Sequence, residues 1–352
     1  MALRAGERER IVAALSWGAV TLSTSKFKID LNTSEKLVAK ARKLAEEVAT
    51  PYCLGMAALS ASASGLCQGK FRRGRDNAII ADDYFRNKCN GVTWERDTSE
   101  MFHTWSLLFM GEFTELNAFA EAAVFDARER GDVYAATSQA VFALAYSRLA
   151  MGDPDGAEVG MEENMSQWAK RGYHMQHFFR MLSMSMIRIY RDQPEDGWAM
   201  FESHWPDIKR AMLLEVRIFE IDYFSFKGRS AVASLLRNPK STEFIRSAEK
   251  CASRLEKMKI DWAGAQASGI LAGLASIVGD KEKSVAHLRA AVTSFDDTDM
   301  GAFAAASRMR LGQLVRGDEG LELVKAGQGF FRSQQVEEIP KMLNVLSPGF
   351  ID

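Results

Sequence analysis

The feature that most constrains this chain is a glycine that recurs about every 20 residues. The spacings between successive members are 20, 20, 21 and 20, and a break at Asp192-Gln193-Pro194 follows; the glycines are Gly91, Gly111, Gly131, Gly152 and Gly172. Several glycines precede an acidic residue, as in Gly131-Asp132. Glycine adopts the left-handed conformation that ends a helix, and an aspartate at the next N-terminus accepts orphan amide hydrogens. Each such pair therefore predicts the end of one helix and the start of another.

Apolar residues between the breaks recur with the period of a helix. Leu37, Ala41 and Leu44 share one helical face, and the preceding Asn32 and Glu35 have the spacing of a capping box. We expect the prolines to stand mainly at helix starts and turns; these are Pro51, Pro154, Pro194 and Pro206. Alternating strand patterns are scarce. The sequence therefore predicts an all-α fold.

Two helices with their turns make a unit of about 40 residues, which is a helical-repeat period. Such a unit cannot bury its apolar face alone, and a single globular core stops growing near about 250–300 residues. We expect a right-handed α-solenoid of about eight tetratricopeptide-like helix pairs. One superhelix would span residues 1–352, with less regular repeats in 1–68 and regular repeats plus a C-terminal cap in 69–352.

Composition argues against several classes of protein. The 352 residues include 45 Lys+Arg and 46 Asp+Glu, so the diffuse attraction of a basic protein for nucleic acid is missing. The small cluster of Arg72, Arg73 and Arg75 is interpreted as a solvated helix start. The sequence predicts no leader peptide and shows no apolar stretch of the ~20 residues that a bilayer requires, so we expect a cytoplasmic protein without membrane contact. Four widely spaced cysteines predict buried thiols in a reducing compartment.

The chemically suggestive side chains are few. His174 and His177 are spaced to share a helix face, but two imidazoles are an incomplete metal site. We expect no metal and no cofactor. Tyr173, His174 and His177 are interpreted as partner-groove residues, together with Trp94 and Glu95, because an aromatic ring between charges suits a binding surface. The stretch 65–71 imitates a phosphate-binding loop, but it has one residue too few between its glycines.

Several segments form a recognisable series, strongest after about residue 85: Lys88–Thr98, Arg130–Thr137, Gly152–Ala157, Trp168–Phe178, Gly301–Gly312 and Ile339–Phe350. Together they resemble the C-terminal tetratricopeptide-like repeat region of large bacterial serine/threonine protein kinases that also carry an NTPase signalling module. The kinase catalytic loop and magnesium motif have no counterpart in this sequence. The resemblance therefore implies the repeat arm alone, as a fragment of a longer gene product or as an independent relative.

The sequence thus favours a non-catalytic helical-repeat module for protein interaction and regulation. Its partner would be a protein or peptide in the concave groove, and the resemblance implies a kinase or NTPase module in cis or in trans. A second hypothesis is a small-molecule sensor with a ligand pocket between helices, since the chain is rich in aromatic residues and methionine. A third hypothesis is an enzyme whose catalytic residues form no recognised motif.

Overall fold

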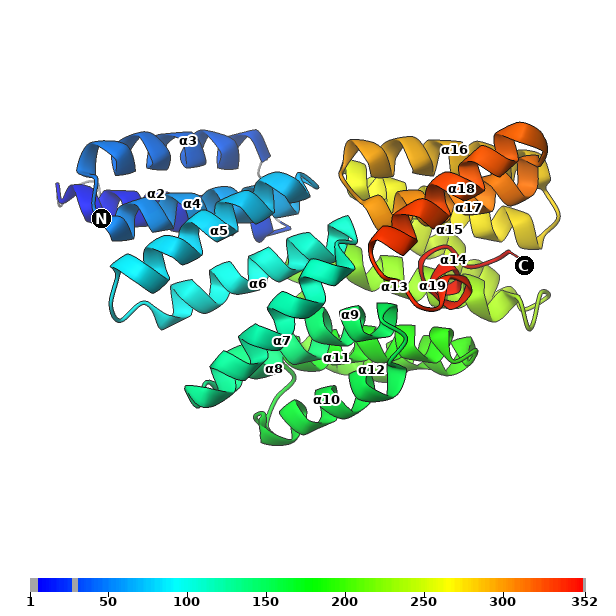
Figure 1. The fold of residues 1–352 in the computed structure, drawn as a ribbon, viewed down its shortest axis with the longest axis horizontal. Coiled ribbons are helices and arrows are strands. Elements are labelled where there is room, and N and C mark those ends of the chain that lie inside the picture. The colour runs from blue at the N-terminus through cyan, green and yellow to red at the C-terminus, as the bar shows by residue number, and fades with distance from the viewer. Residues whose placement is uncertain (1–5, 27–30, 351–352) are drawn as a thin grey trace. The chain divides into compact units, whose positions relative to one another are not determined.

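The protein, a computed structural model that describes residues 6–26 and 31–350, is built from α-helices (Figure 1). The first six helices are α2 (Arg8–Thr24), α3 (Leu31–Val48), α4 (Pro51–Cys67), α5 (Phe71–Lys88), α6 (Thr93–Met110) and α7 (Phe113–Glu129). The next six are α8 (Val133–Gln139), α9 (Ala145–Ala150), α10 (Pro154–Gln167), α11 (Met175–Tyr190), α12 (Pro194–Arg210) and α13 (Arg217–Leu235). The last six are α14 (Thr242–Lys257), α15 (Asp261–Ile277), α16 (Lys281–Asp297), α17 (Gly301–Val315), α18 (Gly317–Ser333) and α19 (Ile339–Leu346).

The helices follow one another as pairs. A π-helical turn, η1 (Ala140–Leu144), joins α8 and α9 into one rod, so the described residues form eight consecutive pairs followed by α19. Strand pairing within the described ranges is limited to an isolated antiparallel bridge between Ser25 and Val216. The predicted all-α fold of stacked helix pairs is confirmed.

The chain forms two compact units. Unit 1 comprises Met1–Leu107 and Glu215–Ile218, and unit 2 comprises Leu108–Leu214 and Phe219–Asp352. The division cuts through α6 and α13, so each of these helices contributes residues to both units. The expected single superhelix, with its change of regularity at residue 68, stays a prediction.

The glycine breaks have the backbone conformation that the spacing predicted. Gly91, Gly111, Gly131, Gly152 and Gly172 all have positive φ angles, from 69° to 84°. The aspartates that follow two of them cap the next helix: Asp132 accepts from the Ala135 amide at 2.9 Å, and Asp153 accepts from the Gly156 amide at 2.8 Å. Other helices end without glycine, at Ala49, Asp192, Met212, Lys259, Asp299, Arg316 and Gln335, with φ from 52° to 59°. Each of these costs on the order of 1 kcal/mol in a residue with a Cβ.

Two details of the expected helix boundaries are wrong. Pro51, Pro154 and Pro194 stand at the first position of α4, α10 and α12, but Pro206 lies inside α12. Proline lacks an N–H, so the Glu202 carbonyl one turn earlier loses its usual helical donor. Asn32 lies inside α3, which includes Leu31, and therefore it does not cap that helix.

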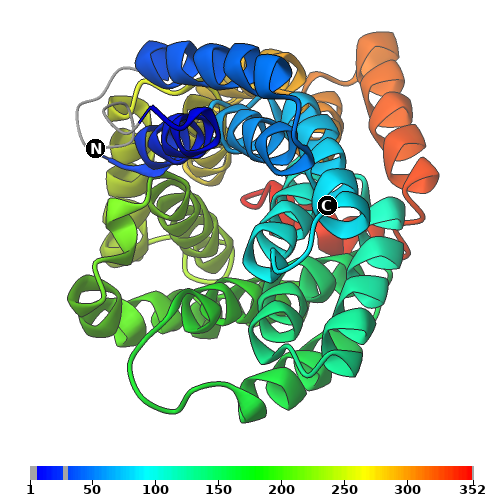
Figure 2. The same cartoon turned by 90° about the vertical axis from the view of Figure 1, so that its left-hand side faces the viewer.

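Small residues hold unit 1 together. Figure 2 shows α3 lying over α2 and α4, which run side by side. Within α4, Ser60, Ser62 and Ser64 are all fully buried. The Ser62 hydroxyl donates to the Gly74 carbonyl at 2.8 Å, and a Cβ on Gly65 would lie 2.9 Å from the Gly74 nitrogen. The backbones of α4 and α5 therefore approach too closely for any larger side chain at Gly65.

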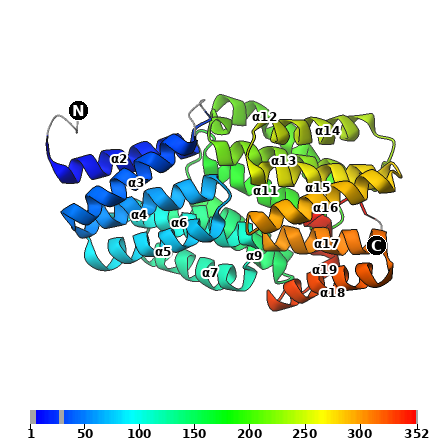
Figure 3. The same cartoon turned by 90° about the horizontal axis from the view of Figure 1, so that it is seen from above.

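Large side chains fill unit 2. The Phe142 and Phe179 rings stack with their centroids 4.5 Å apart, and Phe219 packs edge to face on Phe179 at 5.1 Å. Helices α14 to α18 continue the alternation as antiparallel neighbours, which Figure 3 shows from above. Of the four cysteines expected to be buried, Cys53, Cys67 and Cys251 are, whereas Cys89 is partly exposed, and none of the four forms a disulfide.

Candidate partner-binding site

Three of the predicted groove residues come together at the start of α11. His174 is the residue just before this helix, and its backbone N–H donates to Nδ1 of His177 at 3.1 Å. The indole Nε1–H of Trp168, at the end of α10, donates to Nδ1 of His174 at 3.2 Å. Both imidazoles therefore use Nδ1 as an acceptor, which requires the neutral tautomer protonated at Nε2.

A third histidine completes this group of rings, which we call the histidine cluster (Trp168, Tyr173, His174, His177 and His204). The Tyr173 hydroxyl lies 3.1 Å from Nδ1 of His204 on α12, and the Tyr173 ring stacks on His177 with centroids 5.3 Å apart. These side chains are only partly buried. Sequence reasoning did not select Trp168 or His204, although Trp168 opens the segment that carries the resemblance.

The surroundings of His177 and His204 favour their uncharged imidazoles. Burial, followed by the nearby His174, Arg180 and His204, holds the pKa of His177 below its usual value, and Asp207 opposes this. Burial and Arg180 lower the pKa of His204 in the same way. Burial, with Asp207, raises the pKa of the Tyr173 hydroxyl. No group of three His, Cys, Asp or Glu side chains within the described residues is arranged to hold a metal ion.

The other two predicted residues, Trp94 and Glu95, lie at the start of α6 in unit 1. Trp94 is 50% exposed, and its ring packs against Trp17 of α2 with centroids 4.9 Å apart. Glu95 accepts a hydrogen bond from the Tyr52 hydroxyl at 3.1 Å. Burial and this carboxylate raise the pKa of Tyr52 to about 12. The five predicted residues thus form two groups, one in each compact unit.

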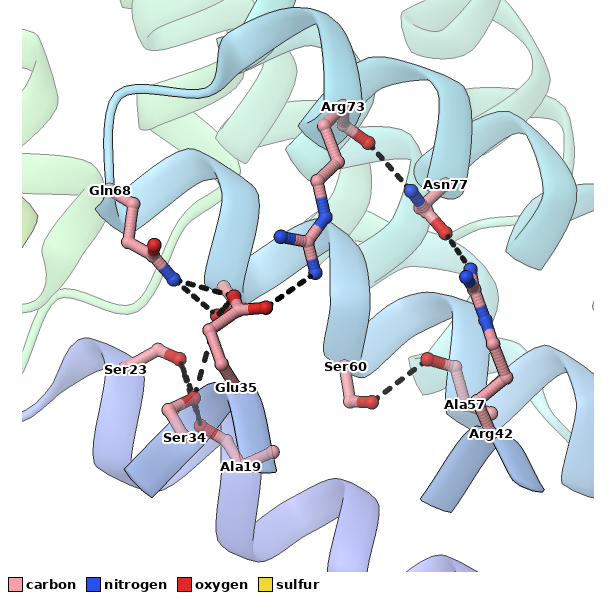
Figure 4. A network of polar contacts seen from close by, with 11 residues as sticks. Ala19, Ser23, Ser34, Glu35, Arg42, Ala57, Ser60, Gln68, Arg73 and Asn77 are labelled. Carbon is pink, nitrogen blue, oxygen red and sulfur yellow. Dashed lines mark hydrogen bonds and ion pairs between the residues drawn. The ribbon is translucent and has the colours of Figure 1, made fainter. Parts of the chain in front are cut away.

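A polar network that the sequence did not reveal lies beside the start of α3 (Figure 4). Glu35 accepts from the Ser64 hydroxyl and the Gln68 amide, both at 2.6 Å, and from Arg73 at 3.0 Å. Burial alone would raise the pKa of Glu35, but these hydrogen bonds and the charge of Arg73 hold it below the ordinary value. The Glu35 carboxylate therefore ties α3 to α4 and α5, and Arg73 is an ion-pair partner rather than a solvated cation.

Residues 336–350 lie along one face of unit 2 and contact five helices in turn. We call α9, α11, α13, α15 and α17 the inner helices because this segment crosses them all. Its Glu337 amide donates to the Ala150 carbonyl of α9 at 3.1 Å, and the Lys341 ammonium lies 5.3 Å from the Tyr190 ring of α11. Farther along, a Cβ on Gly273 of α15 would collide with the Pro348 carbonyl oxygen. The segment, red in Figure 1, thus covers the inner helices of unit 2.

Two buried arginines bind the main chain of this segment. Arg229 of α13 donates to the Val345 carbonyl at 3.2 Å, and Arg310 of α17 donates to the Ser347 carbonyl at the same distance. Arg310 also donates to the side-chain oxygen of Asn344 at 2.7 Å and packs against Phe350. Carbonyl oxygens at the end of a helix lack intrahelical donors and carry partial negative charge. Arg229 and Arg310 therefore act together as a cap for the C-terminal end of α19.

An open pocket of about 460 Å³ lies between α7, α8 and α10. Its lining is largely polar and includes Arg128, Thr137 and Asn164. Arg128 donates to the side-chain oxygen of Asn164 at 3.3 Å, and the Asn164 amide donates to the Gly160 carbonyl at 2.7 Å. The pocket therefore suits a polar ligand. The aromatic and methionine lining that the sequence suggested is not found in this pocket.

Comparison of the chain with protein-family models, with curated proteins and with solved structures finds no match. The resemblance to the repeat region of bacterial kinases therefore stays a prediction. No helix among the described residues combines the length and the apolar character that crossing a bilayer demands.

Proposed function

We propose that this chain is a non-catalytic helical-repeat module that binds a protein or peptide partner and thereby regulates it. By the resemblance described above, the partner is a kinase or NTPase module, in cis or in trans. Stacked helix pairs present extended surfaces that suit polypeptide partners. The proposal places function in surface recognition, with the Trp94 surface and the histidine cluster as its contact points.

The observation that carries this proposal is the exposure of Trp94. On the same helix, Phe102 and Trp105 are 6% and 5% exposed, whereas Trp94 leaves half of its surface open beside Trp17. Tryptophan is enriched among the residues that dominate binding energy, because it buries a large area at little entropic cost. Glu95 adds a fixed acceptor beside it, since Tyr52 holds its carboxylate.

The test compares two variants of the full chain, each lacking one exposed aromatic ring, for binding to a purified kinase–NTPase protein of the resembled class. Trp94→Ala is expected to weaken binding at least tenfold by calorimetry, which corresponds to about 1.4 kcal/mol. Phe125→Ala is the control, because Phe125 is 68% exposed on α7 and belongs to neither contact group. Equal affinities for the two variants, or no binding by the wild-type chain, would contradict the proposal.

A small-molecule sensor is the alternative, and the pocket between α7, α8 and α10 supports it. Its volume of about 460 Å³ is within the range of ligand sites. Thermal-shift measurements on the purified chain with a panel of polar metabolites distinguish the two functions. A saturable rise in melting temperature with one metabolite alone, lost in Arg128→Gln, would favour the sensor.

A further inference from the structure

The contacts between segment 339–350 and unit 2 resemble those of a bound peptide. The segment forms a short helix, α19, and then turns through bends at Ser347 and Gly349. Its apolar side chains are buried against the inner helices; these are Met342, Leu343, Val345, Leu346 and Phe350. Its polar contacts go largely through its backbone, at the Val345 and Ser347 carbonyls. Backbone contacts of this kind give affinity to a peptide, while side-chain pockets select its sequence.

The inner helices also keep polar atoms that this segment does not satisfy. Asp222 and Arg229, which are 2% and 3% exposed, share one face of α13 with Ser225. Asp222 Oδ2 and Ser225 Oγ have no hydrogen-bond partner among the described residues, whereas the Arg229 guanidinium also hydrogen-bonds to the Tyr146 hydroxyl. An unpaired buried polar group is costly, so a peptide that supplied these missing partners would bind here better than segment 339–350 does.

We propose that the face of unit 2 formed by its inner helices is a peptide-binding groove, and that segment 339–350 occupies it as an intramolecular ligand. This face is separate from the Trp94 surface and the histidine cluster, so the proposal goes beyond the proposed interaction function and adds a second binding surface. The partner is a peptide with a short apolar helix whose last carbonyls meet Arg229 and Arg310, followed by a turn and an aromatic side chain. Such a partner enters when segment 339–350 leaves.

The test is the binding of a labelled synthetic peptide of residues 339–350, followed by fluorescence anisotropy. The full chain carrying Phe350→Ala has a weakened intramolecular ligand and is expected to bind the peptide saturably, at least tenfold more tightly than the wild-type chain. Adding Gly273→Ala should abolish this binding, because the new Cβ collides with the carbonyl of Pro348 in the bound peptide. Gly269 lies on the same helix as Gly273, but a Cβ on Gly269 meets nothing within 4 Å. Adding Gly269→Ala should therefore leave peptide binding intact.

A folded Phe350→Ala chain that fails to bind the peptide would overturn the proposal, and so would equal binding in the two glycine variants. Hydrogen exchange on the wild-type chain gives a second test that needs no variant. Amides of 342–347 are expected to exchange at least tenfold faster than those of α13 and α15, because the segment leaves without unfolding the groove. Equal rates would show that the segment is a fixed part of the core. Neither result depends on Trp94, so failure here leaves the proposed interaction function separately testable.

Discussion

Unit 1 and unit 2 are both stacks of helices, yet they close the space between helices by different means. In unit 1, glycine and serine let α4 and α5 approach until their backbones touch at Gly65 and Gly74. In unit 2, stacked phenylalanine rings separate the helices and fill the gaps. Where backbones approach closely, an added atom lowers the stability of the fold. Where rings fill the space, a removed atom lowers it. The same repeat architecture should therefore respond in opposite ways to changes in side-chain size.

The largest effect is expected from Phe179→Ala in unit 2. Phe179 is 2% exposed and contacts the rings of Phe142 and Phe219, so its loss leaves a cavity between three helices. Substitutions of this kind cost about 3–5 kcal/mol. Urea denaturation of the wild-type and variant chains measures the difference. A loss below about 1 kcal/mol would mean that the ring cluster collapses around the gap.

A smaller effect of opposite origin is expected from Gly65→Ala in unit 1. Alanine favours a helix, but its Cβ would lie 2.9 Å from the backbone nitrogen of Gly74, so α4 and α5 must separate. We expect a net loss of about 1–3 kcal/mol. Gly269→Ala is the control, because its Cβ meets nothing within 4 Å. That control should gain about 0.4–1 kcal/mol by the same denaturation assay.

Glu35→Gln tests the polar side of unit 1. The variant loses the charged acceptor for Arg73 and weakens two further hydrogen bonds, in a group that is about one-third exposed. We expect a loss of about 1 kcal/mol at neutral pH. The folded pKa of Glu35 is lowered, so this stability is present above its ordinary value of 4.5 and is lost as pH falls through the folded value. Denaturation curves of the two chains should converge in acid, and a constant difference would argue against the carboxylate charge.

The smallest effect is expected from the histidine cluster in unit 2. Burial, followed by the nearby His174, Arg180 and His204, lowers the pKa of His177, so the neutral imidazole is favoured in the folded chain. The stability that neutral His177 contributes is present above the ordinary value of 6.5 and is lost as pH falls through the lower folded pKa. His177→Asn keeps an acceptor near the position of Nδ1 but does not titrate. Its melting temperature should therefore change less than that of wild type between pH 7 and pH 5, and parallel changes would contradict this account.

The sequence predicted the helical class and most of the helix ends because glycine readily adopts the positive φ angle at which a helix ends. Gly131 and Gly152, each with its following aspartate, needed no tertiary contact to be interpreted correctly. The end at Lys259 was not predicted, because a residue with a side chain adopts positive φ there and no glycine marks the turn. Local signals were therefore sufficient for the class of fold and insufficient for every boundary.

The candidate sites were less predictable because they depend on residues distant in sequence. Tyr173, His174 and His177 were within one segment and were found together, but His204 arrives from α12. Glu35 had the spacing of a local cap, yet its partners are on α4 and α5. In the sequence, one feature could have indicated that residues 336–350 cover the inner helices. Arg229 and Arg310 each lie within an otherwise apolar stretch. A buried cation requires an acceptor, and sequence does not say which carbonyl supplies it.

The discontinuity of unit 1 has a consequence for the order of synthesis. Its first part ends at Leu107, but Glu215–Ile218 belong to it as well. The Lys26 amide donates to the Glu215 carbonyl at 3.0 Å, and Arg217 donates to the Ser25 carbonyl at 3.0 Å. A ribosome adding about 5–20 residues each second needs roughly 5–20 s to reach these residues after Leu107. During that interval the nascent helices around Ser25 lack their contacts with Glu215–Ile218. A translational pause between α6 and α13 would prolong this incomplete state, which chaperones can recognise.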